Sequence, residues 1–333
     1  MKKVLLASLI AGALASGQAN AFNDIVFDFN GAAAGGQQTI SFFDWLPGNA
    51  LSIGALSSGS GVPFTTVYQA KLGSAVKNEG GGGQTSFSPL AGTEFTIQAS
   101  IVEVATGLGG SSASFTVMGG VINMFYDTTP DSNTITGGGY GDGTLILSAS
   151  ILNGTGAFNN ATIGGNAELI PGSGITLCSL GIQTAGCTPV LLDGFGVDNQ
   201  SGVLSHTGNG SSTINAHVDY QDSNFFRSIL TTLEVGLNDT TNLADPFAQT
   251  NPSDTVVGVT PVYTNVGGAR INGDANCRAG GLTEAGVAVA RCDFHFQSDG
   301  ATSFNSAPEP GALALLGLGL VGVAASRRRA KQQ

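Results

Sequence analysis

The sequence is short of charge. Lys, Arg, Asp and Glu make up 11% of its 333 residues, whereas about 25% is usual in soluble domains. Only 12 of these side chains are basic, and the formal net charge is −11. Because a phosphate backbone is held by a basic surface, this balance argues against nucleic acid as a partner.

Residues that often carry chemistry are also few. The chain has three histidines, four cysteines, no C-x-x-C pair and no G-x-S-x-G elbow, so neither a zinc site nor this type of serine nucleophile is indicated. His217 and Asp219 stand two positions apart on a predicted strand, which places both side chains on one face. We interpret them as the polar outer face of that strand. The chain is therefore expected to be no enzyme and to hold no metal or cofactor of its own.

Acidic and glycine-rich loops leave weak calcium binding open. Asn272–Asn276 has the N-x-D-x-N spacing of a calcium loop, but Cys277 stands where such a loop needs glycine. Asp193–Asn199 offers further oxygen ligands. The glycine-rich stretch Gly137–Gly143 is better interpreted as a turn, and its Tyr140 is expected to be exposed.

Both ends of the chain have the composition of targeting segments. Residues 1–21 combine Lys2-Lys3, an apolar run and an Ala19-Asn20-Ala21 cleavage site, which is the layout of a secretory signal peptide. Residues 307–333 contain an uncharged run of 16 residues, Gly311–Ser326. As a helix this run is about 24 Å long, so it spans a bilayer only marginally. The basic cluster after it is kept in the cytoplasm by the positive-inside rule.

The tail resembles a known sorting signal. A proline-flanked acidic motif comes first, the apolar run follows, and an arginine cluster ends the segment: Pro308, Glu309 and Pro310, then Arg327, Arg328 and Arg329. This order is similar to the PEP-CTERM sorting signal. The resemblance implies that an exosortase, a membrane-embedded transpeptidase, cuts near the motif, and that the protein is held in the inner membrane only transiently.

Between these ends, residues 22–306 are predicted to form one ectodomain. Without Lys2, Lys3 and the four basic residues of the tail, six basic residues remain; without Glu309, 22 acidic ones remain, so the net charge is −16. Divalent cations, or neutral polymers bound through hydroxyls and amides, are compatible with such a surface.

Apolar and polar residues alternate through most of the ectodomain, which is the period of β-strands. The predicted second strand ends at the Pro47-Gly48-Asn49 turn, and a change of apolar face near Val102 indicates a bulge or burial on both faces. Turn-rich stretches such as Asn153–Asn166 separate the strands. The candidate strands are Ile25–Phe29, Thr39–Trp45, Phe64–Leu72, Glu94–Ala105, Ala113–Met118, Val121–Asp127, Thr144–Leu152, Thr213–Tyr220, Ser228–Gly236 and Asp293–Phe304.

We therefore predict an all-β fold. The ectodomain should be a large antiparallel β-sandwich-like structure with long Gly/Asn/Ser-rich loops, followed by one C-terminal hydrophobic helix over residues 311–326. Four cysteines permit three pairings. In an exported protein the simplest is the pair of short bridges Cys178–Cys187 and Cys277–Cys292.

Two stretches near the start of the ectodomain carry a second resemblance. Phe22–Gly31 and Phe43–Leu51 are similar to the flocculation-associated PEP-CTERM proteins. This implies a non-catalytic protein at the cell surface or in the extracellular matrix of a Gram-negative bacterium, promoting exopolysaccharide retention and cell aggregation. Two alternatives stay open. One is a secreted polysaccharide hydrolase that uses carboxylates or His217 and Asp219, and the other is a sugar- or ice-binding module without a matrix role.

Overall fold

The computed structural model describes residues 23–31, 35–53, 61–106, 112–134, 137–159, 209–240 and 294–307. In these ranges the regular structure is entirely β, and none of it is an apolar helix of membrane-spanning length. The predicted helix 311–326 lies outside them. The strands are β1 (Ile25–Asp28), β2 (Gln37–Ile40), β3 (Phe42–Ile53), β4 (Pro63–Asn78), β5 (Gln84–Phe87), β6 (Glu94–Thr106), β7 (Ser112–Asp127), β8 (Thr144–Asn159), β9 (Asn209–Gln221), β10 (Leu230–Thr240) and β11 (Phe294–Ser306).

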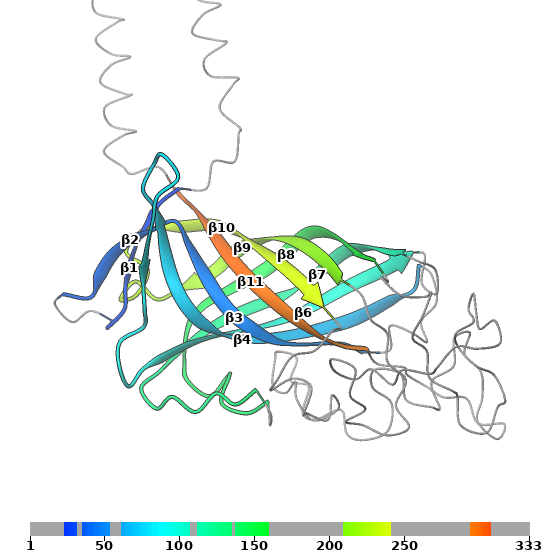
Figure 1. The fold of residues 1–333 in the computed structure, drawn as a ribbon, viewed down its shortest axis with the longest axis horizontal. Coiled ribbons are helices and arrows are strands. Elements are labelled where there is room, and N and C mark those ends of the chain that lie inside the picture. The colour runs from blue at the N-terminus through cyan, green and yellow to red at the C-terminus, as the bar shows by residue number, and fades with distance from the viewer. Residues whose placement is uncertain are drawn as a thin grey trace, which may run out of the picture.

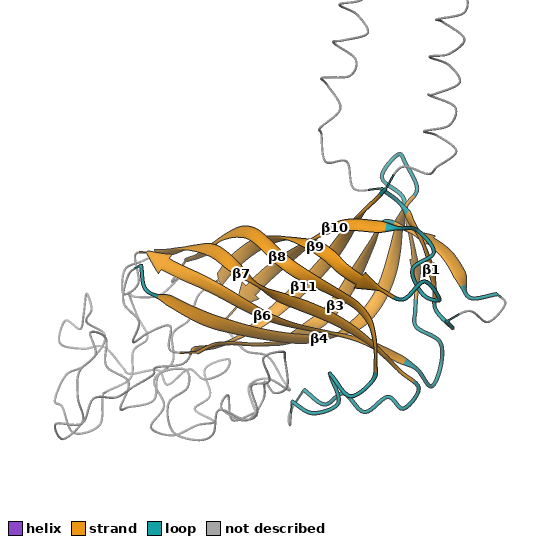
Figure 2. Ribbon diagram, turned by 180° about the vertical axis from the view of Figure 1, so that it is seen from behind, coloured by secondary structure: helices purple, strands orange, loops and turns teal. Residues whose placement is uncertain are grey.

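Eight long strands form one closed antiparallel sheet. Their order is β3-β11-β10-β9-β8-β7-β6-β4, and β4 pairs with β3 to complete the ring. Figures 1 and 2 show the strands tilted around a common interior. The predicted all-β antiparallel class is confirmed. A single sheet rolled onto itself provides the buried inner face that two sheets would provide in a sandwich.

The β1–β2 hairpin packs at one end of this barrel, here called the hairpin end (Figure 1). Phe27 of β1 is fully buried, and its ring lies 4.9 Å from that of Phe43, 5.4 Å from Phe95 and 5.0 Å from Phe226, measured between centroids. The pairs are edge-on, the geometry that aromatic rings prefer. A cluster of phenylalanine rings therefore closes this end of the barrel.

The opposite end, here called the far end, has a different inner face. The inward positions near it combine small side chains, such as Ala50, Ser52 and Ser298, with a separate apolar cluster of Phe64, Ala105 and Phe115. Four connections join strands there: residues 54–62, 107–111, 160–208 and 241–293. The barrel is thus filled by aromatic and aliphatic side chains at the hairpin end, whereas buried polar groups lie among the apolar ones towards the far end.

Several predicted strand bounds are wrong: Thr39–Trp45 falls on both β2 and β3, the two strands predicted over 113–127 are one strand, β7, and β4 continues past Leu72 to Asn78. β3 continues through Pro47-Gly48-Asn49, because residues 46–48 form an irregularity in its register with β4, where proline is tolerated. Gly48 is needed there, since a Cβ atom would lie 2.1 Å from the carbonyl oxygen of Gln69. β8 runs to Asn159 rather than Leu152, because β7 and β9 pair with it along both sides.

The bulge and the two-sided burial predicted near Val102 are both present, but the inward face of β6 does not change there, because Glu103 and Ala105 stay in phase with the buried Ile101. A register shift separates Val102 from Glu103 in the pairing with β7. In addition, residues 94–101 are buried on both faces of β6, because the connection from β7 to β8 folds back over the outside of the barrel. There the Thr96 hydroxyl donates to the carbonyl of Tyr140 (2.8 Å), and the Asn49 amide donates to that of Thr134 (2.8 Å).

Candidate functional site

The predicted sorting residues begin where the barrel ends. β11 stops at Ser306, and the N–H of Ala307 donates to the carbonyl of Ile229 at 2.8 Å. Everything predicted beyond this point lies outside the described residues, as do the signal peptide and the cysteines. The residues concerned are Pro308, Glu309, Pro310, Arg327, Arg328 and Arg329, with Cys178, Cys187, Cys277 and Cys292.

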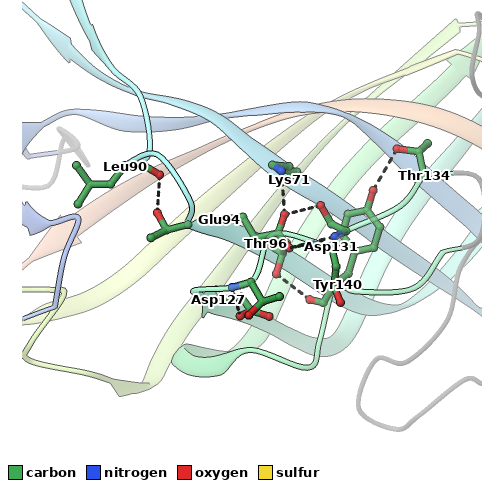
Figure 3. A network of polar contacts seen from close by, with 11 residues as sticks. Lys71, Leu90, Glu94, Thr96, Asp127, Asp131, Thr134 and Tyr140 are labelled. Carbon is green, nitrogen blue, oxygen red and sulfur yellow. Dashed lines mark hydrogen bonds and ion pairs between the residues drawn. The ribbon is translucent and has the colours of Figure 1, made fainter.

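A polar cluster lies on the outside of the barrel, where the β7–β8 connection crosses β4 and β6 (Figure 3). Its centre is Glu94, whose side chain is fully buried. The carboxylate accepts hydrogen bonds from the backbone N–H groups of Asp131 (2.9 Å) and Ser132 (3.0 Å) and from the Ser132 hydroxyl (2.6 Å). It also pairs with Nζ of Lys71 at 2.9 Å.

Glu94, Asp127 and Asp131 are close enough together to hold a metal ion, but the bonds of Glu94 favour another role. A carboxylate has about four lone-pair sites, and four donors already use those of Glu94. Burial acts to raise the pKa of Glu94, but the bonds from Ser132, Lys71 and the two backbone amides outweigh it and lower that pKa. Glu94 is therefore an ionised anchor for the loop.

Replacing Glu94 by glutamine should loosen this loop without unfolding the barrel. Glutamine keeps an oxygen for the loop amides but loses the charge that pairs with Lys71, so we expect a cost of about 1–2 kcal/mol. Hydrogen exchange at the amides of Asp131 and Ser132 should become faster. Glu79→Gln is the matched control, because its pair with Lys77 is exposed and exposed pairs contribute little. Unchanged exchange in Glu94→Gln would contradict the anchor role.

A second polar cluster faces the barrel interior near the far end. The hydroxyl of Thr66 donates to Glu103, and the Ser52 and Thr66 hydroxyls are 2.6 Å apart. On the facing wall the Ser298 hydroxyl donates to Asp239 Oδ1 at 2.7 Å. Among the described residues, no basic side chain forms an ion pair with either carboxyl group.

The two interior carboxyl groups, Glu103 and Asp239, have raised pKa values. Burial raises the pKa of Glu103 to about 7 against the hydrogen bond from Thr66, and the charge of Asp239 raises it further. Burial likewise raises the pKa of Asp239 to about 6. The hydroxyl of Tyr68 is buried with them and has no hydrogen-bond partner among the described residues.

The outer face of β7–β11, here called the outer field, carries many short hydroxyl and amide side chains, with Met118 and Leu152 exposed among them. The sheet register places them in rows around the barrel, one of which runs Thr116, Thr155, Thr213. These five strands contain no Lys or Arg. The exposed members are Ser112, Ser114, Thr116, Thr144, Ser150, Asn153, Thr155, Asn159, Asn209, Ser211, Thr213, Thr231 and Asn238.

His217 and Asp219 belong to this outer field. Both are exposed on β9, and Asp219 accepts a hydrogen bond from the Ser150 hydroxyl at 2.5 Å. The serine therefore donates to the aspartate and not to the histidine, which is not the order of a Ser-His-Asp triad. Ser74 and Lys77 stand at an S-x-x-K spacing on β4, but Lys77 pairs with Glu79 at 3.1 Å.

The exposure of two tyrosines, Tyr140 and Tyr220, differs from what the sequence predicts. Tyr140 is buried, with 4% of its surface exposed, because its loop packs on β6; the expectation that it is exposed is wrong. Tyr220 follows the buried Ile214, Ala216 and Val218 in the alternation of β9, which predicts an inward side chain, but 47% of its surface is exposed. A register shift between Ser148 and Ala149 of β8 lies opposite this end of β9 and breaks the alternation.

The interior carboxyl groups were missed in the sequence, although a signal for them was present. Glu103 stands in phase with the buried Ile101 of β6, and Asp239 in phase with the buried Leu237 of β10. Alternation alone therefore places both carboxyl groups inward. The predicted calcium loops Asn272–Asn276 and Asp193–Asn199 lie outside the described residues.

Comparison with known proteins identifies a sorting motif near the C-terminal end of the sequence. The family model of the PEP-CTERM protein-sorting motif matches residues 306–329. No curated protein and no solved structure matches the chain. The resemblance to flocculation-associated proteins is not confirmed and stays a prediction. The match covers the predicted acidic motif, apolar run and arginine cluster, and it supports an exported protein that an exosortase processes. Directly after the last strand of its barrel, the chain thus carries a PEP-CTERM sorting motif.

Proposed function

We propose that the exported barrel is a non-catalytic matrix protein that retains exopolysaccharide and holds cells together. The observation that carries this is the outer face of β7–β11. Hydroxyl and amide groups stand there in register on adjacent strands, and a neutral or weakly charged polymer offers matching donors and acceptors along its length. An acidic surface without basic residues excludes phosphate-rich polymers from this role.

The interior carboxyl groups do not favour the hydrolase alternative. Glu103 and Asp239 resemble an acid pair, and their raised pKa values suit proton transfer near neutral pH. However, the interior of an eight-stranded barrel is filled by side chains or holds one small ligand, so a polysaccharide chain does not reach them there. The outer field offers an extended polymer a surface, and it has exposed carboxylates but no buried pair.

The test changes the outer field and leaves the fold intact. In Thr213→Glu combined with Ser114→Glu, the new charges stand on strands that are not neighbours and each replaces a hydroxyl. We expect about tenfold weaker co-sedimentation with the host's own exopolysaccharide, since each lost hydrogen bond contributes about 0.5–1.5 kcal/mol. Cells carrying only this variant should flocculate poorly. The matched control is Ser86→Glu with Ser88→Glu, at exposed positions beside β5.

Two further results separate the alternatives. In a host that produces the protein without residues 308–333, the protein should stay unsorted and the cells dispersed. Normal flocs from this host would contradict the matrix role. Depolymerisation of the exopolysaccharide by the purified mature protein would support the hydrolase. Polymer binding without any effect on aggregation would support a binding module alone.

A further inference from the structure

We propose that, before processing, the barrel stands on the membrane with its hairpin end against the lipid headgroups, so that its far end points away from the bilayer. This inference goes beyond the matrix role and does not depend on it. It rests on the place where the chain leaves the barrel, on the length of chain that follows, and on the side chains around that exit.

The exit point is fixed by hydrogen bonds. Ser306 is opposite Leu230 in the register of β10 and β11, and Ala307 is held by the carbonyl of Ile229. The start of the described chain is at the same end, where the N–H of Asn23 donates to the carbonyl of Phe304 at 3.1 Å. The paired part of the barrel therefore continues up to the residue before the sorting motif's first proline.

The chain that follows is too short to act as a spacer. The uncharged run begins at Gly311, four residues after Ala307, and four extended residues span at most roughly 14 Å. A lipid headgroup layer is itself several ångströms deep, since it makes up the difference between about 30 Å of hydrocarbon and about 40–45 Å of whole bilayer. With the apolar run in the membrane, the hairpin end has to lie at the headgroup surface.

Exposed apolar side chains lie at the hairpin end, one of them directly beside the exit. Ile229, whose carbonyl holds Ala307, is 66% exposed, the largest value among the exposed large apolar residues described. Tyr220 at the end of β9 and Leu90 before β6 are 47% and 44% exposed. Aliphatic side chains and a tyrosine are suited to the boundary between headgroups and hydrocarbon. A bilayer is the occupant that the chain's own tail brings to this surface.

The orientation decides what the protein presents outward. Residues 160–208 and 241–293 both begin and end at strand ends of the far end, so they are attached on the side away from the membrane. Most exposed side chains of the outer field on β7–β11 lie in the half of the barrel towards the far end.

Tryptophan quenching tests the orientation. Full-length protein, tail included, is reconstituted in vesicles of phosphatidylethanolamine and phosphatidylglycerol whose acyl chains are brominated near the headgroups. Ile229→Trp supplies a reporter at the hairpin end, and Val62→Trp supplies a matched reporter at the far end, where Val62 is 47% exposed. The emission of the single native tryptophan, Trp45, which is buried, is subtracted from both.

We expect emission from Ile229→Trp to be quenched several-fold more than emission from Val62→Trp, and shifted to the blue. Equal quenching, or stronger quenching at position 62, would overturn the proposal. If Ile229→Trp is not quenched in vesicles but slows removal of the tail in host cells, the surface contacts the processing enzyme and not lipid, which also overturns the proposal. Polymer binding is measured without vesicles, so failure of the orientation leaves the matrix proposal standing.

Discussion

At pH 8, Glu103→Gln is expected to increase the free energy of unfolding by about 3 kcal/mol. The pKa of this buried carboxyl group is about 7 in the folded chain instead of the ordinary 4.5, and a difference of that size corresponds to about 3 kcal/mol. Because the folded-state pKa is raised, protonation favours the fold. The contribution is fully present below about pH 4.5 and is lost as the pH rises through 7. Glutamine has the shape of the protonated acid and cannot ionise.

Chemical denaturation at a series of pH values measures this effect. The wild-type protein and Glu103→Gln should have equal stability near pH 4 and diverge as the pH approaches 8. Asp239→Asn should act in the same direction and more weakly, because Asp239 remains partly accessible to solvent. Glu79→Gln is the control of opposite sign, since hydrogen bonds from Lys77 and Thr85 lower the pKa of Glu79. Parallel curves for wild type and Glu103→Gln would show that Glu103 ionises normally.

Phe27→Ala is expected to lower the free energy of unfolding by about 4 kcal/mol, the cost typical of removing a buried phenylalanine. Phe27 has no exposed surface and contacts five other phenylalanine rings, from the hairpin itself, from the barrel wall and from the connection after β9. No neighbouring chain segment is free to fill the space, since the wall positions are fixed by strand pairing. The melting temperature should fall by roughly 8–16 °C.

Calorimetry with a graded series checks this result. Phe27→Leu should lose about half as much stability, because most of the buried volume is retained. Met118→Ala is the matched control, since Met118 is 62% exposed on β7 and truncation of an exposed side chain usually changes stability by less than about 0.5 kcal/mol. A melting temperature of Phe27→Ala equal to that of wild type would show that the hairpin does not hold the barrel closed.

The strands were predictable because their signal is local. Alternation of apolar and polar residues located most of β3–β11 and fixed the all-β class. Where the alternation was broken, pairing with neighbours decided the outcome: β8 continues through Gly154 and Gly156 because β7 and β9 bond to it on both sides. β3 passes Pro47 because an irregular register accommodates a proline.

The closure of the barrel and the burial of its polar groups depend on contacts between residues that are distant in the sequence. A local pattern contains no information about such contacts. Alternation is the same in a sandwich and in a closed ring, so the pairing of β3 with both β4 and β11 was not predictable from it. The burial of Tyr140 and of the polar face of β6 follows from a connection that folds back over the wall. Glu103 and Asp239 are brought near each other only when the ring closes.

Ring closure also sets the order in which the exported chain can fold. β11 completes the ring by pairing with β10 on one side and with β3 on the other. Phe43 of β3 therefore pairs with Thr302 of β11, and most of the sequence lies between these two residues. Closing such distant contacts is slow compared with forming local hairpins. In a chain that crosses the membrane N-terminus first, β3 and β10 keep unpaired edges until residue 306 has emerged. The sorting motif starts at that same residue. An anchored tail would therefore hold each chain apart from its neighbours while its last strand is inserted, when exposed edges are most prone to aggregate.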